Sequence, residues 1–310
     1  MKIAYSPCPN DTFVFHALVH GLIPGAPEFD VTYADIDITN RWAAGEGYSG
    51  DLDNSPDNPV RLSGSSNTDS LGGLGNPVRP DVLKISFAAL PWVLSEYALL
   101  PCGGALGRGC GPLILTKNKS AILTGRKIAV PSERSTAYLL FRLWAAQNVP
   151  GGVGEIVIMP FHQIMPAIRD GLVDAGLVIH EARFTYPSYG LHLLTDLGNW
   201  WEADSGLPIP LGAIIAHRSL DLAAITGWIR ASVEYAWAHP EVSREYVLHH
   251  AQEMNPDVAQ AHIDLYVNQF TANLGENGYK AVTALLSRAS REGLVPGMNP
   301  TTLSIMKSLF

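Results

Sequence analysis

Apolar strand-like runs alternate with amphipathic segments along the first 218 residues. Runs that are typical of buried strands occur at residues 2–6, 29–36, 81–86, 111–116, 126–132, 154–160, 174–180 and 211–218. Apolar residues three or four positions apart predict helices between them, at 12–21, 39–45, 87–97, 135–148 and 161–173. From residue 219 the pattern is helical to the end. This order predicts an α/β protein whose sheets are mostly parallel.

Residues 47–81 interrupt the alternation. Of these 35 residues, 25 are Gly, Pro, Ser, Asn or Asp, which is the composition of a loop. A loop of this length is unusual inside a compact domain, and it marks either a lid or a dispensable insertion. We interpret it as an insertion, because it has too few apolar residues to bury a core of its own.

Composition and charge narrow the class of protein. The chain has 310 residues, 47% of them hydrophobic and 16% charged, which predicts a folded protein of one or two domains. Its net charge of −8 and the absence of a basic stripe argue against nucleic-acid binding, whereas a small anion needs few cations. We find no signal-peptide pattern and no apolar run of membrane-spanning length, so we expect a cytoplasmic protein without a membrane partner. The oligomeric state is not indicated.

Polar side chains gather where predicted strands end and helices begin. Ligands of open α/β sheets bind at the carboxyl ends of strands, and helix starts offer unpaired N–H groups to anions. Three such junctions, "SPCPNDTF", "KISFAAL" and "PSERSTAY", carry Ser6, Asn10, Thr12, Lys84, Ser86, Ser132, Ser135 and Thr136. These residues are either ordinary helix caps or donors to one shared anion, and the pattern alone leaves both interpretations open.

The fourth junction, "GLVIHEARF", has His180 and Glu181 instead of hydroxyls. His180 is either a hydrogen-bonded residue at the end of a strand or a proton acceptor at the mouth of a cleft. Glu181 should face the opposite side of an extended chain, so we expect it to be structural. The other nine histidines, His262 among them, are not predicted to belong to the site, and no HExxH motif occurs.

The sequence gives only weak signals for a nucleophilic cysteine, a cysteine pair or a phosphate-binding loop. Cys8 lies between two prolines, and nothing near it in sequence would lower its pKa enough to make it a nucleophile. The three cysteines form no CxxC pair, which favours a reducing compartment. The glycine-rich stretch 103–111 precedes a strand, so it predicts a turn or hinge rather than a phosphate loop. We therefore expect neither a metal nor an organic cofactor.

Five stretches together carry a resemblance: "SPCPNDTF", "KIS", "GGALGRGCGPL", "VPSERSTAY" and "IHEARFTYPSYGL". They resemble the 1,4-dihydroxy-6-naphthoate synthase family of the futalosine route to menaquinone, over nearly the whole chain outside residues 47–81. The resemblance implies the two-lobed fold of type II periplasmic binding proteins, with a ligand cleft between the lobes. It also implies a lyase that converts cyclic dehypoxanthine futalosine into 1,4-dihydroxy-6-naphthoate without a cofactor.

The resemblance also assigns site residues. It places the catalytic general base at His180 and contacts to a carboxylate-bearing substrate at Lys84, Ser86, Ser135 and Thr136. The family usually has two threonines where this chain has Ser135 and Thr136, which should preserve the donors. It also has a short link where this chain has residues 47–81, so the extra residues stand just upstream of Lys84 and Ser86.

The implied fold predicts two crossings between lobes, at 111–116 and 211–218. Residues 1–110 and 212–310 would form the larger lobe, and residues 111–211 the smaller one. Two other functions remain as alternatives: a non-catalytic protein of the same fold that binds a small anion, and a chorismate dehydratase. The stretch "IHEARFTYP" argues against a chorismate dehydratase. Turnover of a substrate would distinguish an enzyme from a protein that only binds an anion.

Deleting the loop-like segment tests its interpretation. Replacing residues 49–78 with a short Gly-Ser link should leave the fold and most of kcat intact, because the segment contributes little buried apolar surface. Circular dichroism measures whether the fold is intact, and the rate of naphthoate formation measures kcat. A loss of about 100-fold or more in kcat would show instead that the segment works as a lid.

Overall fold

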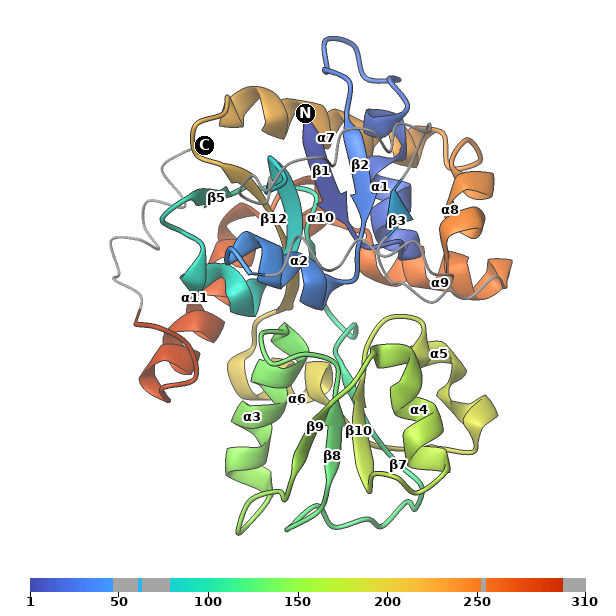
Figure 1. Ribbon diagram of the computed structural model, residues 1–310, viewed down its shortest axis with the longest axis vertical. Coiled ribbons are helices and arrows are strands. Elements are labelled where there is room, and N and C mark those ends of the chain that lie inside the picture. Colours follow the sequence, from blue (N-terminus) through green and yellow to red (C-terminus); the bar gives the residue numbers. More distant parts are fainter. Residues whose placement is uncertain (47–60, 63–78, 252–254, 298–310) are drawn as a thin grey trace, which may run out of the picture.

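Two β-sheets, one in each of two lobes, organise the chain (Figure 1). The computed structural model describes residues 1–46, 61–62, 79–251 and 255–297. Residues 49–78, which the deletion test replaces, therefore lie mostly outside the described residues. Within it, β3 (Arg61–Leu62) is described and pairs antiparallel with β2 (Asp30–Tyr33).

The sheet of the upper lobe has its parallel strands in the centre. In order, its strands are β3, β2, β1 (Lys2–Tyr5), β4 (Val82–Ser86), β12 (Ile209–His217) and β5 (Tyr97–Leu99). The strand β6 (Ala105–Gly107) also pairs with β12. β2, β1 and β4 are parallel, and β12 runs antiparallel to β4, β5 and β6. The carboxyl ends of β1 and β4 therefore point the same way.

The lower lobe is a five-stranded sheet with helices on both faces. Its order is β11 (His192–Asp196), β7 (Leu113–Thr116), β10 (Ala175–Val178), β8 (Ile128–Val130) and β9 (Ile156–Ile158). β10, β8 and β9 are parallel, whereas β7 is antiparallel to both of its neighbours.

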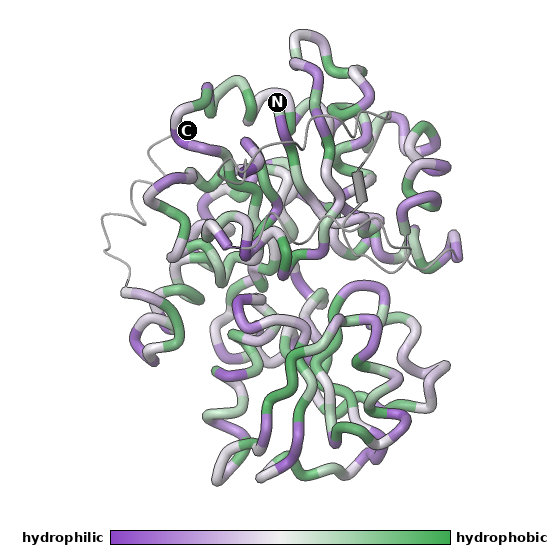
Figure 2. Tube along the Cα trace, viewed as in Figure 1, coloured by the Kyte–Doolittle hydropathy of each residue, from purple (hydrophilic) through white to green (hydrophobic). Residues whose placement is uncertain are grey.

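Alternation along the strands explains how both faces of this sheet are covered. Ile128 and Val130 pack with the core that includes Leu140 of α3 (Thr136–Asn148). Ala129, between them, faces the core that includes Ile164 of α4 (Phe161–Arg169). Strands covered on both faces are apolar throughout, and Figure 2 shows the strands of the lower lobe as mainly hydrophobic segments.

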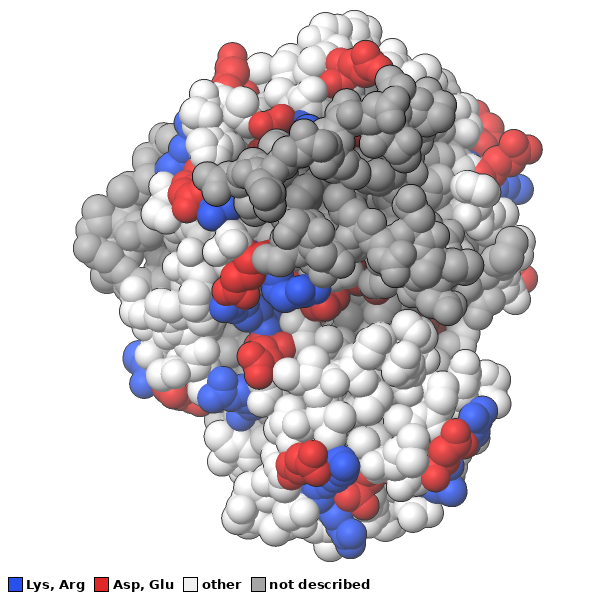
Figure 3. All heavy atoms as spheres, viewed as in Figure 1, with Lys and Arg blue, Asp and Glu red and all other residues white. Residues whose placement is uncertain are grey.

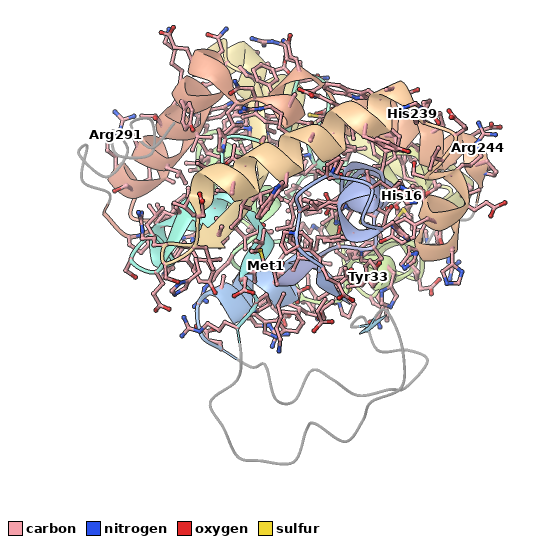
Figure 4. All side chains as sticks on the ribbon, turned by 90° about the horizontal axis from the view of Figure 1, so that it is seen from above. Met1, His16, Tyr33, His239, Arg244 and Arg291 are labelled. Carbon is pink, nitrogen blue, oxygen red and sulfur yellow. The ribbon has the colours of Figure 1, made fainter. Side chains whose placement is uncertain are left out.

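Helices from the two ends of the chain pack together in the upper lobe. α1 (Pro9–Val19) lies against α7 (Leu222–Ala238), which crosses the top of the lobe and ends beside His239 (Figure 4). The buried Ser232 hydroxyl of α7 donates to the backbone oxygen of Val14 at 2.6 Å and accepts from the backbone N–H of Leu18 at 3.1 Å. The remaining helices are α2 (Ile36–Ala43), α5 (Ala182–Thr185), α6 (Leu197–Ser205), α8 (Arg244–His250), α9 (Pro256–Tyr266), α10 (Gln269–Ala272) and α11 (Gly275–Arg291).

The chain passes between the sheets twice. Residues 108–112 connect β6 of the upper sheet to β7 of the lower one, and residues 206–208 connect α6 to β12. These connections lie close to the predicted crossings at 111–116 and 211–218. The domain boundaries drawn from those crossings, with residues 111–211 as the smaller lobe, stay a prediction.

The prediction that the sheets are mostly parallel is wrong, because among the described strands four pairings are parallel and six are antiparallel. Three further features differ from the sequence prediction. The helix predicted at 87–97 is a 3₁₀ helix, η2 (Phe87–Trp92), because Pro91 lacks an N–H group and blocks a longer helix. The strands β5, β6 and β11 were not predicted; they are short, and pairing with β12 and β7 stabilises them. The helix predicted at 12–21 begins at Pro9. Asn10 and Asp11 therefore lie in its first turn instead of capping it.

Charges on the surface are mixed in sign. On the face shown in Figure 3, outside the grey residues, Lys and Arg alternate with Asp and Glu. None of the helices in the described part of the chain combines the length and the apolar character needed to cross a membrane.

A close backbone approach at the first crossing generates a stability prediction. A Cβ atom at Gly111 would lie 2.1 Å from the backbone nitrogen of Gly198. Gly111→Ala must therefore push β7 away from the start of α6, and it should lower Tm by about 3–10 °C in thermal unfolding. Gly227→Ala is the matched control, because a Cβ there meets nothing within 4 Å in an exposed turn of α7. Equal Tm values for the Gly111 variant and the parent would show that the approach is not needed.

Candidate functional site

A pocket lies between the two lobes, lined by residues of both. All five residues that the sequence assigns to the site line it: Lys84, Ser86, Ser135, Thr136 and His180. They come together because β4 and β10 end here and α3 begins here. The structure therefore brings the predicted residues to one place, while their roles toward a ligand stay predictions.

Lys84 does not face the pocket as an unpaired cation. Its ammonium forms an ion pair with the carboxylate of Asp11, and the two side chains are 4% and 3% exposed. The same carboxylate accepts hydrogen bonds from the Ser6 hydroxyl at 2.7 Å and the Asn10 amide at 2.8 Å. Asp11, which the sequence analysis did not assign to the site, thus neutralises the cation that was expected to meet a substrate carboxylate.

Two of the predicted hydroxyls donate their protons to the protein. Ser135 donates to the backbone oxygen of Ser132 at 3.0 Å and caps α3 by accepting from the N–H of Tyr138 at 3.1 Å. Thr136 donates to the backbone oxygen of Leu211 at 2.8 Å and accepts from the N–H of Ala88 at 3.1 Å. A hydroxyl has one proton, so these two side chains can only accept from a ligand in this arrangement. Their predicted contacts with a substrate stay a prediction, and in this arrangement their hydroxyl protons are used within the protein.

Ser86 is held by a different group. Its hydroxyl accepts from the Asn40 side-chain amide at 3.1 Å, and its backbone N–H donates to the oxygen of the same amide at 2.8 Å. Asn40 lies in α2. One side chain therefore fixes both the strand end and the hydroxyl that reaches the pocket.

His180 has an unusual backbone conformation. Its φ is 57°, and it is the non-glycine residue with positive φ in the described part of the chain. This left-handed region is strained for a residue with a Cβ and is enriched at functional sites. The imidazole Nδ1 lies 3.4 Å from the thiol sulfur of Cys8, so the bend turns the ring toward the N-terminal turn of α1.

The environment keeps the His180 imidazole neutral. Its pKa is lowered from 6.5 to about 4, chiefly by burial; the charge of Asp11 opposes this shift and that of Lys84 adds to it. A neutral imidazole is the form that accepts a proton. The imidazole of His180 is therefore unprotonated at neutral pH.

The expectation that Glu181 faces the opposite side from His180 is wrong, while its structural role stays a prediction. It assumed an extended chain, whereas His180 is left-handed and Glu181 is helical with φ −64° and ψ −22°. The turn brings both side chains to the same side, so that ligand atoms of Cys8, His180 and Glu181 all lie within 4.8 Å of one another. Among the described residues, this is the group that could share a metal ion. The expectation of a metal-free site stays a prediction.

Two groups close to His180, the thiol of Cys8 and the carboxyl of Asp35, have raised pKa values. Burial, with the charges of Glu181 and Asp11, raises the pKa of the Cys8 thiol well above its usual value. Cys8 is therefore a protonated thiol and a poor nucleophile. Burial, Asp37 and Glu181 raise the pKa of Asp35 to about 7. Asp35 is a second titrating group close to this corner of the pocket.

The sequence analysis missed His262. This residue of α9 is 1% exposed and lines the pocket, and its Nε2 lies 2.9 Å from the side-chain oxygen of Asn10. Its ring lies 6.3 Å from that of His180, at an interplanar angle of 16°. The available signal was its position on the buried face of α9, between Ala259 and Tyr266. Nothing local shows that this face meets the pocket.

The fold and the site together define a class of protein: two lobes that enclose a pocket lined by both polar and apolar side chains. Among solved structures, a protein from Archaeoglobus fulgidus is 30% identical with a TM-score of 0.78, covering 95% of this chain and 98% of the other. The alkanesulfonate-binding protein SsuA from Xanthomonas axonopodis pv. citri has a TM-score of 0.63 at 14% identity, over 96% and 94% of the two chains. The predicted fold of the periplasmic-binding-protein type is confirmed.

Sequence comparison is more specific. The family model described as menaquinone biosynthesis matches residues 78–291. A 1,4-dihydroxy-6-naphthoate synthase from Streptomyces coelicolor is 61% identical over 98% of both chains. One from Thermus thermophilus is 40% identical over 95% of both chains. This chain belongs to the menaquinone biosynthesis family, and the resemblance seen in its motifs is confirmed.

The lowered pKa of His180 predicts how stability depends on pH. Between pH 6.5 and about 4 the unfolded chain binds a proton at this residue that the folded protein does not. The contribution of His180 to stability is therefore complete above pH 6.5 and is lost as the pH falls toward 4. We expect the loss in free energy of unfolding between pH 7 and pH 5, measured with urea, to be smaller in His180→Asn than in the parent.

Asp35 acts in the opposite direction, since protonation of a carboxyl with a raised pKa stabilises the folded protein as the pH falls. It is present in both proteins, so the difference between them reports His180. Equal losses would contradict the neutral, partly buried imidazole.

Proposed function

We propose that this protein is a carbon–carbon lyase of menaquinone biosynthesis that converts cyclic dehypoxanthine futalosine into 1,4-dihydroxy-6-naphthoate. The observation that carries the proposal is the 61% identity, over 98% of both chains, to the synthase from Streptomyces coelicolor. The pocket supports it, because it combines a neutral imidazole with an ion pair and hydroxyls in a space between two lobes.

His180 is the general base in this proposal. Detaching the sugar-derived part of the substrate to leave an aromatic naphthoate requires a proton to leave a carbon or hydroxyl of the substrate. The unprotonated imidazole receives that proton, and apolar side chains of the pocket such as Ile179 and Leu211 exclude water around it. Carbon acids and hydroxyls are weak acids, so a dry site with a fixed base favours the transfer.

The substrate's carboxylate fits the side of the pocket formed by Lys84, Ser86 and the start of α3. The N-terminus of α3 supplies positive potential there, and a lysine ammonium has donors beyond the one that Asp11 uses. Ser135 and Thr136 would accept from substrate hydroxyls with their remaining lone pairs. The residues proposed to hold the substrate therefore divide into donors and acceptors across the two lobes. No metal or organic cofactor enters this scheme.

A non-catalytic function on the same fold is the second candidate. It is favoured by the likeness to the alkanesulfonate-binding protein, which at 14% identity concerns the fold alone. A protein that only binds a ligand has no use for a strained histidine beside the pocket, so the conformation of His180 favours catalysis. Chorismate dehydratase, the third possibility, lacks support from the relatives found along the full length of the chain.

The central test is turnover by purified protein without an added cofactor, in the presence of a chelator, with the naphthoate detected by chromatography. His180→Asn should lower kcat at least about 100-fold, because positioned general bases typically contribute about 10²–10⁴-fold. In the parent, kcat/KM should fall only as the pH approaches about 4, where the imidazole becomes protonated.

His239→Asn is the control, since this histidine lies at the end of α7 on the surface (Figure 4). Near-normal kcat in His180→Asn, or loss of activity together with unfolding, would contradict the assignment. Activity that disappears with the chelator and returns with one metal ion would contradict the metal-free mechanism.

A further inference from the structure

His262 has one ring nitrogen without a hydrogen-bond partner. Its Nδ1 is buried and finds no partner among the described residues, although the residue lines the pocket. Burying a polar atom without a partner is costly, so such atoms are rare unless they serve a ligand or water. The atom therefore needs an account that the fold alone does not supply.

The hydrogen-bond chain behind His262 fixes its tautomer. The carboxylate of Asp11, paired with Lys84, can only accept, so the Asn10 amide nitrogen that lies 2.8 Å away donates to it. The amide oxygen of Asn10 must then face Nε2 of His262, at 2.9 Å, and this oxygen can only accept. Nε2 consequently carries the ring proton.

The ring is neutral as well. Burial lowers the pKa of His262 well below its usual value, and His180 and Lys84 lower it further. A neutral ring with its proton on Nε2 has a bare lone pair on Nδ1. A residue of the pocket wall therefore carries a buried hydrogen-bond acceptor, and the contacts from Lys84 through Asp11 and Asn10 hold its ring in place.

We infer that Nδ1 of His262 accepts a hydrogen bond from a hydroxyl group of the bound substrate, and that it makes the same bond to a ring hydroxyl of the naphthoate product. The inference deepens the proposed function and rests on it. It makes His262 a substrate-contacting residue that selects for a hydroxylated ligand, distinct from the proton-accepting role of His180. The lobes contribute one histidine each: α9 of the upper lobe and the end of β10 in the lower lobe.

Two substitutions separate the two ring nitrogens. His262→Gln places an amide near the position of Nε2, which retains a donor to Asn10 and removes the acceptor at Nδ1. His262→Asn places its amide near the position of Nδ1, which retains an acceptor toward the pocket and removes the bond to Asn10. The probes are 1,4-dihydroxy-6-naphthoate and naphthalene-2-carboxylate, which has the same ring and carboxylate without the hydroxyls.

Calorimetry should show that His262→Gln raises Kd for the dihydroxynaphthoate by about 5–30-fold, the range expected when a buried hydrogen bond is lost. Its Kd for naphthalene-2-carboxylate should match that of the parent. His262→Asn should bind the dihydroxynaphthoate within about threefold of the parent, since it keeps the acceptor. Unchanged binding of both ligands by a folded His262→Gln would overturn the inference, and so would equal weakening of both ligands.

A measurement on the parent protein covers the case in which the variants do not fold. The nitrogen NMR shift of His262 Nδ1 should move on addition of the dihydroxynaphthoate and not on addition of naphthalene-2-carboxylate; the same shift change with both would overturn the inference. A parent protein that binds the dihydroxynaphthoate and turns over substrate, with Nδ1 unmoved, would overturn the inference alone. A parent that does neither would contradict the proposed function, and the inference with it.

Discussion

The buried ion pair between Lys84 and Asp11 is the interaction on which the pocket depends. Two charges removed from water are stable only when each is paired and hydrogen-bonded, and Asp11 meets this condition through Lys84, Ser6 and Asn10. The pair joins the first turn of α1 to β4 and orients Asn10 toward His262. Its two charges act on the pKa of His180 in opposite directions, so burial dominates and keeps that imidazole neutral.

Hydrogen bonds and close backbone contacts join the two lobes. Thr136, at the start of α3 in the lower lobe, joins the backbones of Ala88 and Leu211. Gly111 and Gly198 allow two backbone segments to approach where the chain first crosses. These contacts use hydroxyls and glycines that the sequence pattern marks only as polar or flexible. The Thr136 hydroxyl therefore serves the architecture and also borders the site, which limits what it can offer a ligand.

Part of the fold and of the site could be predicted because local patterns report it. The apolar runs at β1, β4, β7, β8, β10 and β12 are buried, and burial leaves a periodic signal in the sequence. His180 could be predicted as a site residue because a histidine directly follows one of these apolar segments. The strands β5, β6 and β11 left no comparable signal, because three to five residues are too few to show a period and their stability comes from their partners.

The sequence by itself determined the order of strands and helices, the junctions at which ligand-binding side chains gather, and the family to which their motifs point. The tertiary structure alone decided that Lys84 is paired with Asp11, 73 positions away, and that Asn10 meets His262 across 252 positions. It also decided that Glu181 turns to the same side as His180, through a left-handed residue that no local propensity predicts. The physical reason is that periodicity records which face of an element is buried, whereas the charge state and the free lone pairs of a buried group depend on partners brought together from distant parts of the chain.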